Sequence, residues 1–258
     1  MKIDVMASLC KNCQQEINGN FCSNCGQSSR VGRMSFTNVM RQIPVSVFSL
    51  DRGMLFTIKE MFLEPGLMVR NYLEGQRVRY VKPLSFLVVM ITLNLLFQTG
   101  APNTLNFGNA EQVENLMTVK LLRYLFIEKF AYGVLVLLFI GSISTALAFW
   151  KRKYSYFEHV VLNAYLFGFL TFAVLLFKPL SIWSEGVPFW EEVVGKVKFL
   201  FMAGFPLKVY YEFFEKYSIW KTMRRVTLAG FIFSILLILF LVLLSGLEWD
   251  QIQQMANS

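Results

Sequence analysis

The sequence predicts an all-α integral membrane protein with about five transmembrane helices, preceded by amphipathic juxtamembrane helices and a small amino-terminal ribbon of four cysteines. Two observations lead to this fold class. The 258-residue chain is 55% hydrophobic and only 16% charged, which is too apolar for a soluble protein of this size. Apolar stretches close to the roughly 20 residues that cross a hydrocarbon core recur along the chain.

Windows of about 19 residues single out five candidate spans. They are 84–97, 130–150, 157–177, 197–214 and 226–247. The second, third and fifth are clear apolar runs. The first is short, and the fourth contains Gly204, Pro206, Lys208 and Glu212, so it is the least typical of a membrane helix. We expect the transmembrane domain to cover residues 84–258.

The distribution of Lys and Arg predicts the orientation. Segments on the side of the amino terminus contain 18 of these residues, and segments on the other side contain six. Because basic residues are retained on the inner side, the amino terminus is expected inside and the carboxyl terminus outside, which requires an odd number of spans. This topology also explains the net charge of +8, so we expect no nucleic-acid partner.

All four cysteines lie in two CxxC pairs within residues 1–30, Cys10 with Cys13 and Cys22 with Cys25. Two such knuckles can place four thiolates tetrahedrally around one ion, so we expect a four-cysteine zinc ribbon with one structural Zn. An iron site and two disulfides are the alternatives, and a reducing cytosol disfavours the disulfides. With four cysteine ligands no coordination position stays open, so the metal would not activate water.

Residues 31–83 are expected to form cytosolic, amphipathic juxtamembrane helices. Apolar residues recur at helical spacing over 35–50, and a second apolar stretch follows at 54–63. Pro65 is placed to begin a short helix that Gly75 would end.

Three basic residues, Arg77, Arg79 and Lys82, directly precede the first span. They are candidate contacts for anionic lipid headgroups at the inner membrane surface. A solvated basic flank that only sets topology is the alternative.

Several short motifs carry a family resemblance. They are Cys25-Gly26-Gln27, Asp51-Arg52-Gly53 with Thr57, Glu64-Pro65-Gly66, the run 72–80 with Pro83, and Tyr156-Phe157-Glu158-His159. Together they resemble a family of uncharacterised, Bacteroidetes-type bacterial membrane proteins with a zinc-ribbon head on a multi-span domain of unknown function. The resemblance implies a multi-pass protein of the bacterial inner (cytoplasmic) membrane, so the charge pattern places the amino terminus in the cytosol and the carboxyl terminus in the periplasm. It implies no activity.

Two ionisable pairs lie in or near the predicted spans and are candidate lipid or ligand contacts, since charge at membrane depth is costly. Glu158 and His159 begin the third span, where they could also be interfacial packing residues. Lys208 and Glu212 lie four residues apart in the fourth span, where an intrahelical ion pair is the simpler interpretation. A break at 204–206 would favour a transport pathway.

These features favour a membrane scaffold or adaptor that docks a cytosolic partner through the ribbon, or anionic lipid. The first alternative is a small transporter or channel. The second is a lipid-modifying enzyme with Glu158 and His159 as acid and base. No nucleotide-binding or nucleophile motif is present, so we assign no catalytic residue and favour a non-enzymatic role. Asn94 and Asn163 are expected to bond between helices.

Overall fold

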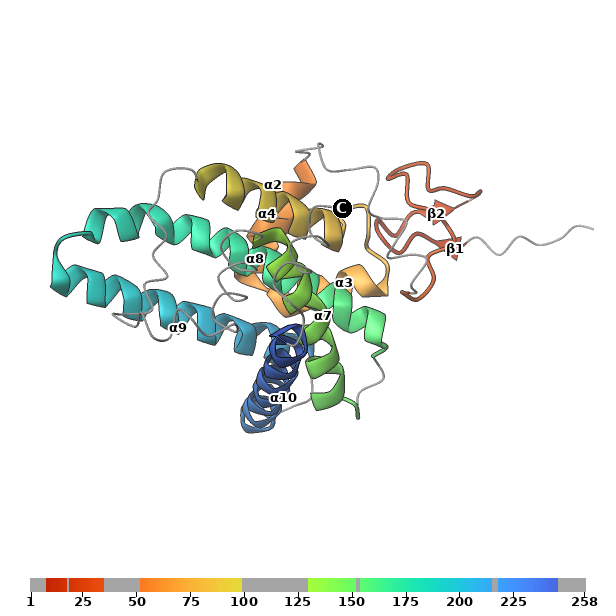
Figure 1. The fold of residues 1–258 in the computed structure, drawn as a ribbon. Coiled ribbons are helices and arrows are strands. Elements are labelled where there is room, and N and C mark those ends of the chain that lie inside the picture. Colours follow the sequence, from red (N-terminus) through yellow and green to blue (C-terminus); the bar gives the residue numbers. More distant parts are fainter. Residues whose placement is uncertain are drawn as a thin grey trace, which may run out of the picture.

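The computed structural model describes residues 8–17, 19–34, 52–98, 130–151, 154–214 and 218–245 (Figure 1). Within these ranges the elements are β1 (Ser8–Leu9), β2 (Glu16–Ile17), α2 (Arg52–Leu63), α3 (Pro65–Glu74), α4 (Pro83–Gln98), α7 (Phe130–Ala148), α8 (Tyr156–Ser184), α9 (Pro188–Phe213) and α10 (Ile219–Ser245). The helix predicted over 35–50 lies outside the described residues.

All five predicted spans fall on helices, and three of these helices are long and apolar enough to cross a membrane. The three are Ala131–Ala148, Tyr156–Ser184 and Ile219–Leu243, in α7, α8 and α10. They correspond to the three clear apolar runs of the sequence. This finding indicates a membrane protein.

The other two helices, α4 and α9, are less suited to crossing a membrane. α4 has 16 residues, which is about 24 Å at ~1.5 Å per residue and less than the roughly 30 Å of a hydrocarbon core. α9 has 26 residues but carries charged side chains along its length. The structure therefore supports three spans by length and composition within the described part of the chain.

The helices alternate in direction. α4 runs parallel to α8, because Phe86 packs on Tyr165 and Asn94, further along α4, donates to the carbonyl of Thr171. α9 runs antiparallel to α8, since Phe205 stacks on Phe169 and Tyr210, further along α9, donates to Asn163, which lies earlier in α8.

Two further contacts give the direction of the remaining helices. α7 runs antiparallel to α8, because Gly141 lies against Phe167 and Thr145 accepts from Asn163. α10 runs antiparallel to α7, because Arg225 donates to the Ala148 carbonyl and Phe233, further along α10, lies near Gly141, earlier in α7. Figure 1 shows α8 and α9 as a long hairpin that extends away from the ribbon.

The expected break at Gly204-Phe205-Pro206 is wrong, because α9 continues through Pro206. A proline inside a helix removes one backbone hydrogen bond. Packing compensates for this loss here: Phe205, Val209 and Tyr210 are buried, and Phe205 stacks on the rings of two neighbouring phenylalanines.

α2 and α3 belong to the main core and do not form a separate surface layer. Met61, Met68 and Tyr72 are almost completely buried in the same cluster as Phe169 and Phe213 from the bundle. Proline begins α3 and Gly75 ends it with φ 126°, as predicted. The apolar faces that sequence periodicity assigned to juxtamembrane helices therefore pack on α8 and α9.

Gly66 in α3 lies where two helices approach closely. A Cβ atom at this position would lie 2.3 Å from the Phe213 nitrogen and 2.4 Å from the Glu212 Cβ, both on α9. The nitrogen is part of the helix backbone and the Cβ is bonded directly to it, so neither atom can move aside as the end of a flexible side chain can.

Gly66→Ala is therefore expected to destabilise the fold by about 1–3 kcal/mol, the usual cost of overpacking. Thermal unfolding of the detergent-solubilised protein, followed by size-exclusion chromatography, measures the change. Gly204→Ala in α9 is the matched control, since nothing lies within 4 Å of its added Cβ. Equal unfolding midpoints for both variants would contradict this close approach.

Candidate metal centre

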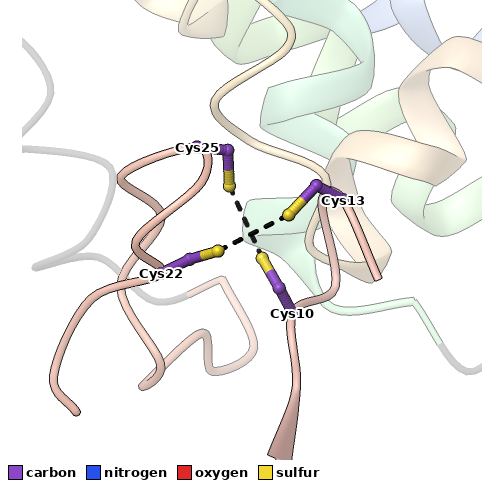
Figure 2. Close-up of side chains that lie close together, drawn as sticks. All are labelled: Cys10, Cys13, Cys22 and Cys25. Atoms are coloured by element: carbon purple, nitrogen blue, oxygen red, sulfur yellow. Dashed lines mark hydrogen bonds between the residues drawn. The ribbon is translucent and has the colours of Figure 1, made fainter. Parts of the chain in front are cut away.

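The four cysteine sulfurs converge on one point (Figure 2). All four Sγ atoms lie within 4.8 Å of one another, with Cys10 and Cys25 3.6 Å apart and Cys13 and Cys22 3.5 Å apart. Sulfurs placed tetrahedrally at about 2.3 Å from an ion would lie roughly 3.8 Å from each other. The arrangement is compatible with a metal site. The four thiols are free, and their spacing exceeds the ~2.05 Å of a disulfide.

Each CxxC pair is shaped by a tight backbone turn. In the first, the Cys10 nitrogen donates to the Gln15 carbonyl at 2.8 Å, and in the second, the Cys22 nitrogen donates to the Gln27 carbonyl at 2.8 Å. The residue after each second cysteine is left-handed: Gln14 has φ 62° and Gly26 has φ 74°. Glycine adopts this conformation without steric cost, whereas Gln14 does so under the constraint of the turn.

Two of the thiols have shifted pKa values. The backbone N–H of Gln15, with smaller contributions from neighbouring side chains, lowers the pKa of Cys13 to about 6. Burial raises the pKa of Cys25 to about 11. A bound dication would lower the pKa of all four thiols, because the thiolate is the ligand form.

The ribbon is held against the connection between α3 and α4 by the side chain of Gln27. Its Nε2 donates to the Gly75 carbonyl at 2.5 Å, and its Oε1 accepts from the Arg77 and Val78 nitrogens at 3.1 and 3.3 Å. Gln27 is only 3% exposed. Since a buried unpaired backbone group costs about 1–3 kcal/mol, these three bonds make the amide an important part of the interface.

Neighbouring contacts extend this interface. Asn12 Oδ1 accepts from the Arg79 nitrogen at 3.3 Å, and Arg77 Nη2 donates to the Gly32 carbonyl at 2.6 Å. A Cβ atom at Gly75 would lie 2.7 Å from Lys11 Cδ. The absence of a side chain at Gly75 therefore lets the first knuckle approach this turn.

Glu158 joins the segment after the ribbon to the start of α8. Its carboxylate pairs with Arg33 through two contacts, Nε to Oε1 at 3.1 Å and Nη2 to Oε2 at 3.5 Å. Glu158 also completes a capping box with Ser155, accepting from the Ser155 nitrogen at 2.7 Å. Helix capping and ion pairing therefore explain this acidic residue without a ligand.

His159, the second member of this pair, is buried against Phe214, and its Nδ1 has no hydrogen-bond partner. One turn further along α8, Asn163 forms the centre of a polar network. Its amide donates to Thr145 at 2.9 Å, and its carbonyl accepts from the Tyr210 hydroxyl at 2.8 Å. These bonds confirm that Asn163, like Asn94, connects helices.

Lys208 and Glu212 lie at the junction between α2 and α3. Lys208 Nζ donates to the carbonyls of Phe62 and Leu63, at 3.0 and 2.8 Å. Glu212 Oε2 accepts from the Gly66 nitrogen at 3.0 Å, and the two charges lie 3.8 Å apart. A cation at the end of α2 and an anion at the start of α3 both complement the helix dipoles.

The three basic residues before α4 have different surroundings. Burial lowers the pKa of the Arg77 guanidinium, which lies 5.9 Å from the Tyr72 ring. Arg79 lies 4.3 Å from the ring of Phe56, whereas Lys82 is partly exposed. Headgroup binding by these residues stays a prediction.

Residues 51–95 match a family model described as "Protein of unknown function (DUF3667)". A DUF3667 domain of unknown function therefore lies at α2, α3 and most of α4. No curated protein and no solved structure matches the chain. The DUF3667 segment contains the turn that receives Gln27 and the helix junction capped by Lys208 and Glu212.

Sequence reasoning identified the four cysteines but missed the residues that position the ribbon. Gln27 was noted only as part of a motif that carries the resemblance, Gly75 only in such a motif and as the end of a helix, and Arg33 only in the charge count. Two signals could have drawn attention to Gln27. It lies two residues after the second CxxC pair, and it is an amide in a segment too small to bury polar groups by itself.

Gln27→Ala is expected to release the turn at residues 75–80 while the metal stays bound. Loss of its acceptor should speed amide exchange at Arg77 and Val78 by at least about fivefold, since one hydrogen bond contributes about 1 kcal/mol. Hydrogen–deuterium exchange with mass spectrometry of the metal-loaded protein measures this. Gln15→Ala, the equivalent position of the first knuckle, is the matched control and should leave the turn protected. Unchanged exchange in Gln27→Ala would show that other contacts hold the ribbon.

Proposed function

We propose that this chain is a polytopic inner-membrane scaffold or adaptor. Its metal-bound ribbon is rigidly mounted on the cytosolic end of the membrane domain, where it docks a cytosolic partner or anionic lipid. The observation that carries this proposal is the attachment of the ribbon through Gln27 and Asn12. A folded module held in one orientation is suited to presenting a surface, whereas a flexibly tethered one is not.

We propose Zn²⁺ as the ion. Four cysteine thiolates with tetrahedral spacing are the donor set of structural zinc sites. Among the described residues, the core of the ribbon consists of Cys10, Ile17 and Cys22 with two partly buried cysteines, which is too small to fold unaided. Metal binding would therefore supply the folding free energy of this segment.

We also propose five crossings, with the amino terminus cytosolic and the carboxyl terminus periplasmic. The alternating directions of α4, α7, α8, α9 and α10 support this topology. The charges agree with it, because Arg225 lies near the same end of the bundle as the ribbon-proximal start of α8. The short α4 would need local thinning of the bilayer or flanking residues to complete its crossing.

Anionic lipid headgroups are the second ligand class in this proposal. Lys82 and the exposed side chain of Arg33 lie near the ends of α4 and α8 that face the ribbon. Each basic residue close to an anionic surface gains roughly 1 kcal/mol.

The transporter and enzyme alternatives have less support. Lys208 and Glu212 are already bonded to backbone groups of α2 and α3, and α9 has no break beside them. The carboxylate of Glu158 already binds Arg33 and the Ser155 nitrogen, so its contacts are those of a residue that positions neighbouring segments. The scaffold proposal uses these polar residues as structural groups.

Lys208→Met separates the structural and transport roles. Loss of the cation leaves two helix-terminal carbonyls without their donor, so thermal stability should fall by about 1 kcal/mol for this partly exposed group. Lys196→Met removes a more exposed pair with Glu192 in the same helix and should have no measurable effect. Ion or solute flux in proteoliposomes that disappears in Lys208→Met at unchanged stability would favour the transporter.

Cys10→Ser combined with Cys13→Ser tests the scaffold and the ion together. The parent should contain one equivalent of zinc by plasma mass spectrometry, and the variant less than about a tenth of that, because two thiolates cannot complete a tetrahedral site. A partner that co-purifies with the parent should be lost while membrane insertion is unchanged. Identical pull-downs from parent and variant would remove the main support for an adaptor.

A further inference from the structure

The ribbon is an internal repeat with an offset of 12 residues. Residues 9–15 read Leu-Cys-Lys-Asn-Cys-Gln-Gln and residues 21–27 read Phe-Cys-Ser-Asn-Cys-Gly-Gln. Each half therefore contains an apolar residue, two cysteines, an asparagine between them and a glutamine two residues after the second cysteine.

The structure repeats along with the sequence. Leu9 pairs with Glu16 in the first half, and Phe21 pairs with Ser28 in the second. The turn bonds correspond as well: the Gln14 nitrogen donates to the Cys10 carbonyl at 2.8 Å, and the Gly26 nitrogen donates to the Cys22 carbonyl at 2.9 Å. The two halves are therefore related by an approximate twofold axis through the metal site.

The asparagines follow the same symmetry. The side chain of Asn24 lies within hydrogen-bonding reach of the Cys13 thiol, and that of Asn12 lies within reach of the Cys25 thiol. Each asparagine therefore contacts the thiol of the opposite half. As a result, Gln27 and Asn12 share one side of the ribbon, and their equivalents Gln15 and Asn24 share the other.

One of these two sides is already filled by the chain itself. Gln27 binds one carbonyl and two nitrogens of the turn at Gly75–Val78, and Asn12 accepts from the nitrogen of Arg79. All four bonds go to backbone atoms. This side therefore recognises backbone groups of a tight turn, in which the Arg77 nitrogen also donates to the Gly75 carbonyl at 2.9 Å.

The equivalent side lies exposed. Gln15 and Asn24 are both more exposed than Gln27, which the turn buries. Leu9 is exposed too, by 60%, and its strand partner Glu16 directly follows Gln15. Exposed large apolar residues beside polar groups are typical of a recognition surface.

We propose that the side of the ribbon formed by Gln15 and Asn24 is a second peptide-docking site. Its occupant is a turn segment of a cytosolic protein. This turn offers Gln15 one carbonyl and the N–H groups of the second and third residues after it, as Gly75, Arg77 and Val78 offer them to Gln27. This inference rests on the proposed adaptor function and names the chemistry of its partner.

Two differences between the halves define the partner further. Ser23 occupies the position equivalent to Lys11, whose side chain lies close to Gly75. Because serine is shorter, the docked segment needs no glycine at the position equivalent to Gly75. The exposed carboxylate of Glu16 lies next to Gln15 where the other half has Ser28, so basic flanking residues are favoured and an anionic lipid headgroup is disfavoured.

The test uses a fluorescent, terminally blocked peptide with the sequence of residues 73–81 and the full-length, zinc-loaded protein in phosphatidylcholine nanodiscs. Fluorescence anisotropy should show binding to the parent, and Gln15→Ala should weaken it at least about fivefold. Gln27→Ala should bind as the parent does. A peptide methylated on the nitrogens of Arg77 and Val78 should not bind, since it lacks both donors.

Several results would overturn the site. They are no binding to the parent, equal binding to parent and Gln15→Ala, and binding that is lost in Gln27→Ala but kept in Gln15→Ala, which would show that the peptide replaces the chain's own turn. Binding gained only when residues 35–50 are replaced by a Gly-Ser linker would assign the surface to that segment. A dimer that Gln15→Ala dissociates would assign it to a second copy.

The pull-down with the double cysteine variant separates this inference from the adaptor function. A partner lost with the cysteines but retained by Gln15→Ala leaves the adaptor in place and overturns this site. Peptide binding that depends on Gln15, combined with identical pull-downs from parent and cysteine variant, supports the site and overturns the adaptor.

Discussion

The buried side-chain amide of Gln27 is the contact on which the relation between ribbon and membrane domain depends. It forms hydrogen bonds with three backbone groups of a turn. The turn lies outside regular secondary structure, which would otherwise supply partners for such groups. Because Gln27 follows Cys25 by two residues, its position is set by the same turn that positions the sulfur. The turn that brings the four sulfurs together and the contact with the DUF3667 segment are therefore coupled.

A second recurring contact in this structure is a basic side chain that binds carbonyls at the end of another helix. Lys208 binds the last carbonyls of α2, Arg225 binds the Ala148 carbonyl at the end of α7, and Lys178 binds the Phe97 carbonyl near the end of α4. In each case a cation from a later helix meets the negative end of an earlier one. Such contacts satisfy carbonyls that would otherwise lack a donor in an apolar environment, so ionisable residues in this bundle can be structural.

Much of the fold could be predicted because it follows from local pattern. The five apolar runs, the helix between Pro65 and Gly75 and the four-cysteine cluster each depend on residues close together in the sequence. The interpretation of polar residues was less successful, since their partners are distant: Glu158 pairs with Arg33 and Lys208 with Phe62 and Leu63. A break at Pro206 was predicted because a local rule ignores the packing of Phe205 on α8.

By itself, the sequence determined that the chain has long apolar helices and an amino-terminal cysteine cluster, because hydropathy and CxxC spacing are properties of short segments. Only the tertiary structure decided that the ribbon sits on the turn after α3, that α2 and α3 enter the core, and that one of two equivalent ribbon faces is filled. These three features depend on which backbone groups have no hydrogen-bond partner within their own segment. The folded chain brings those groups to the side chains that satisfy them.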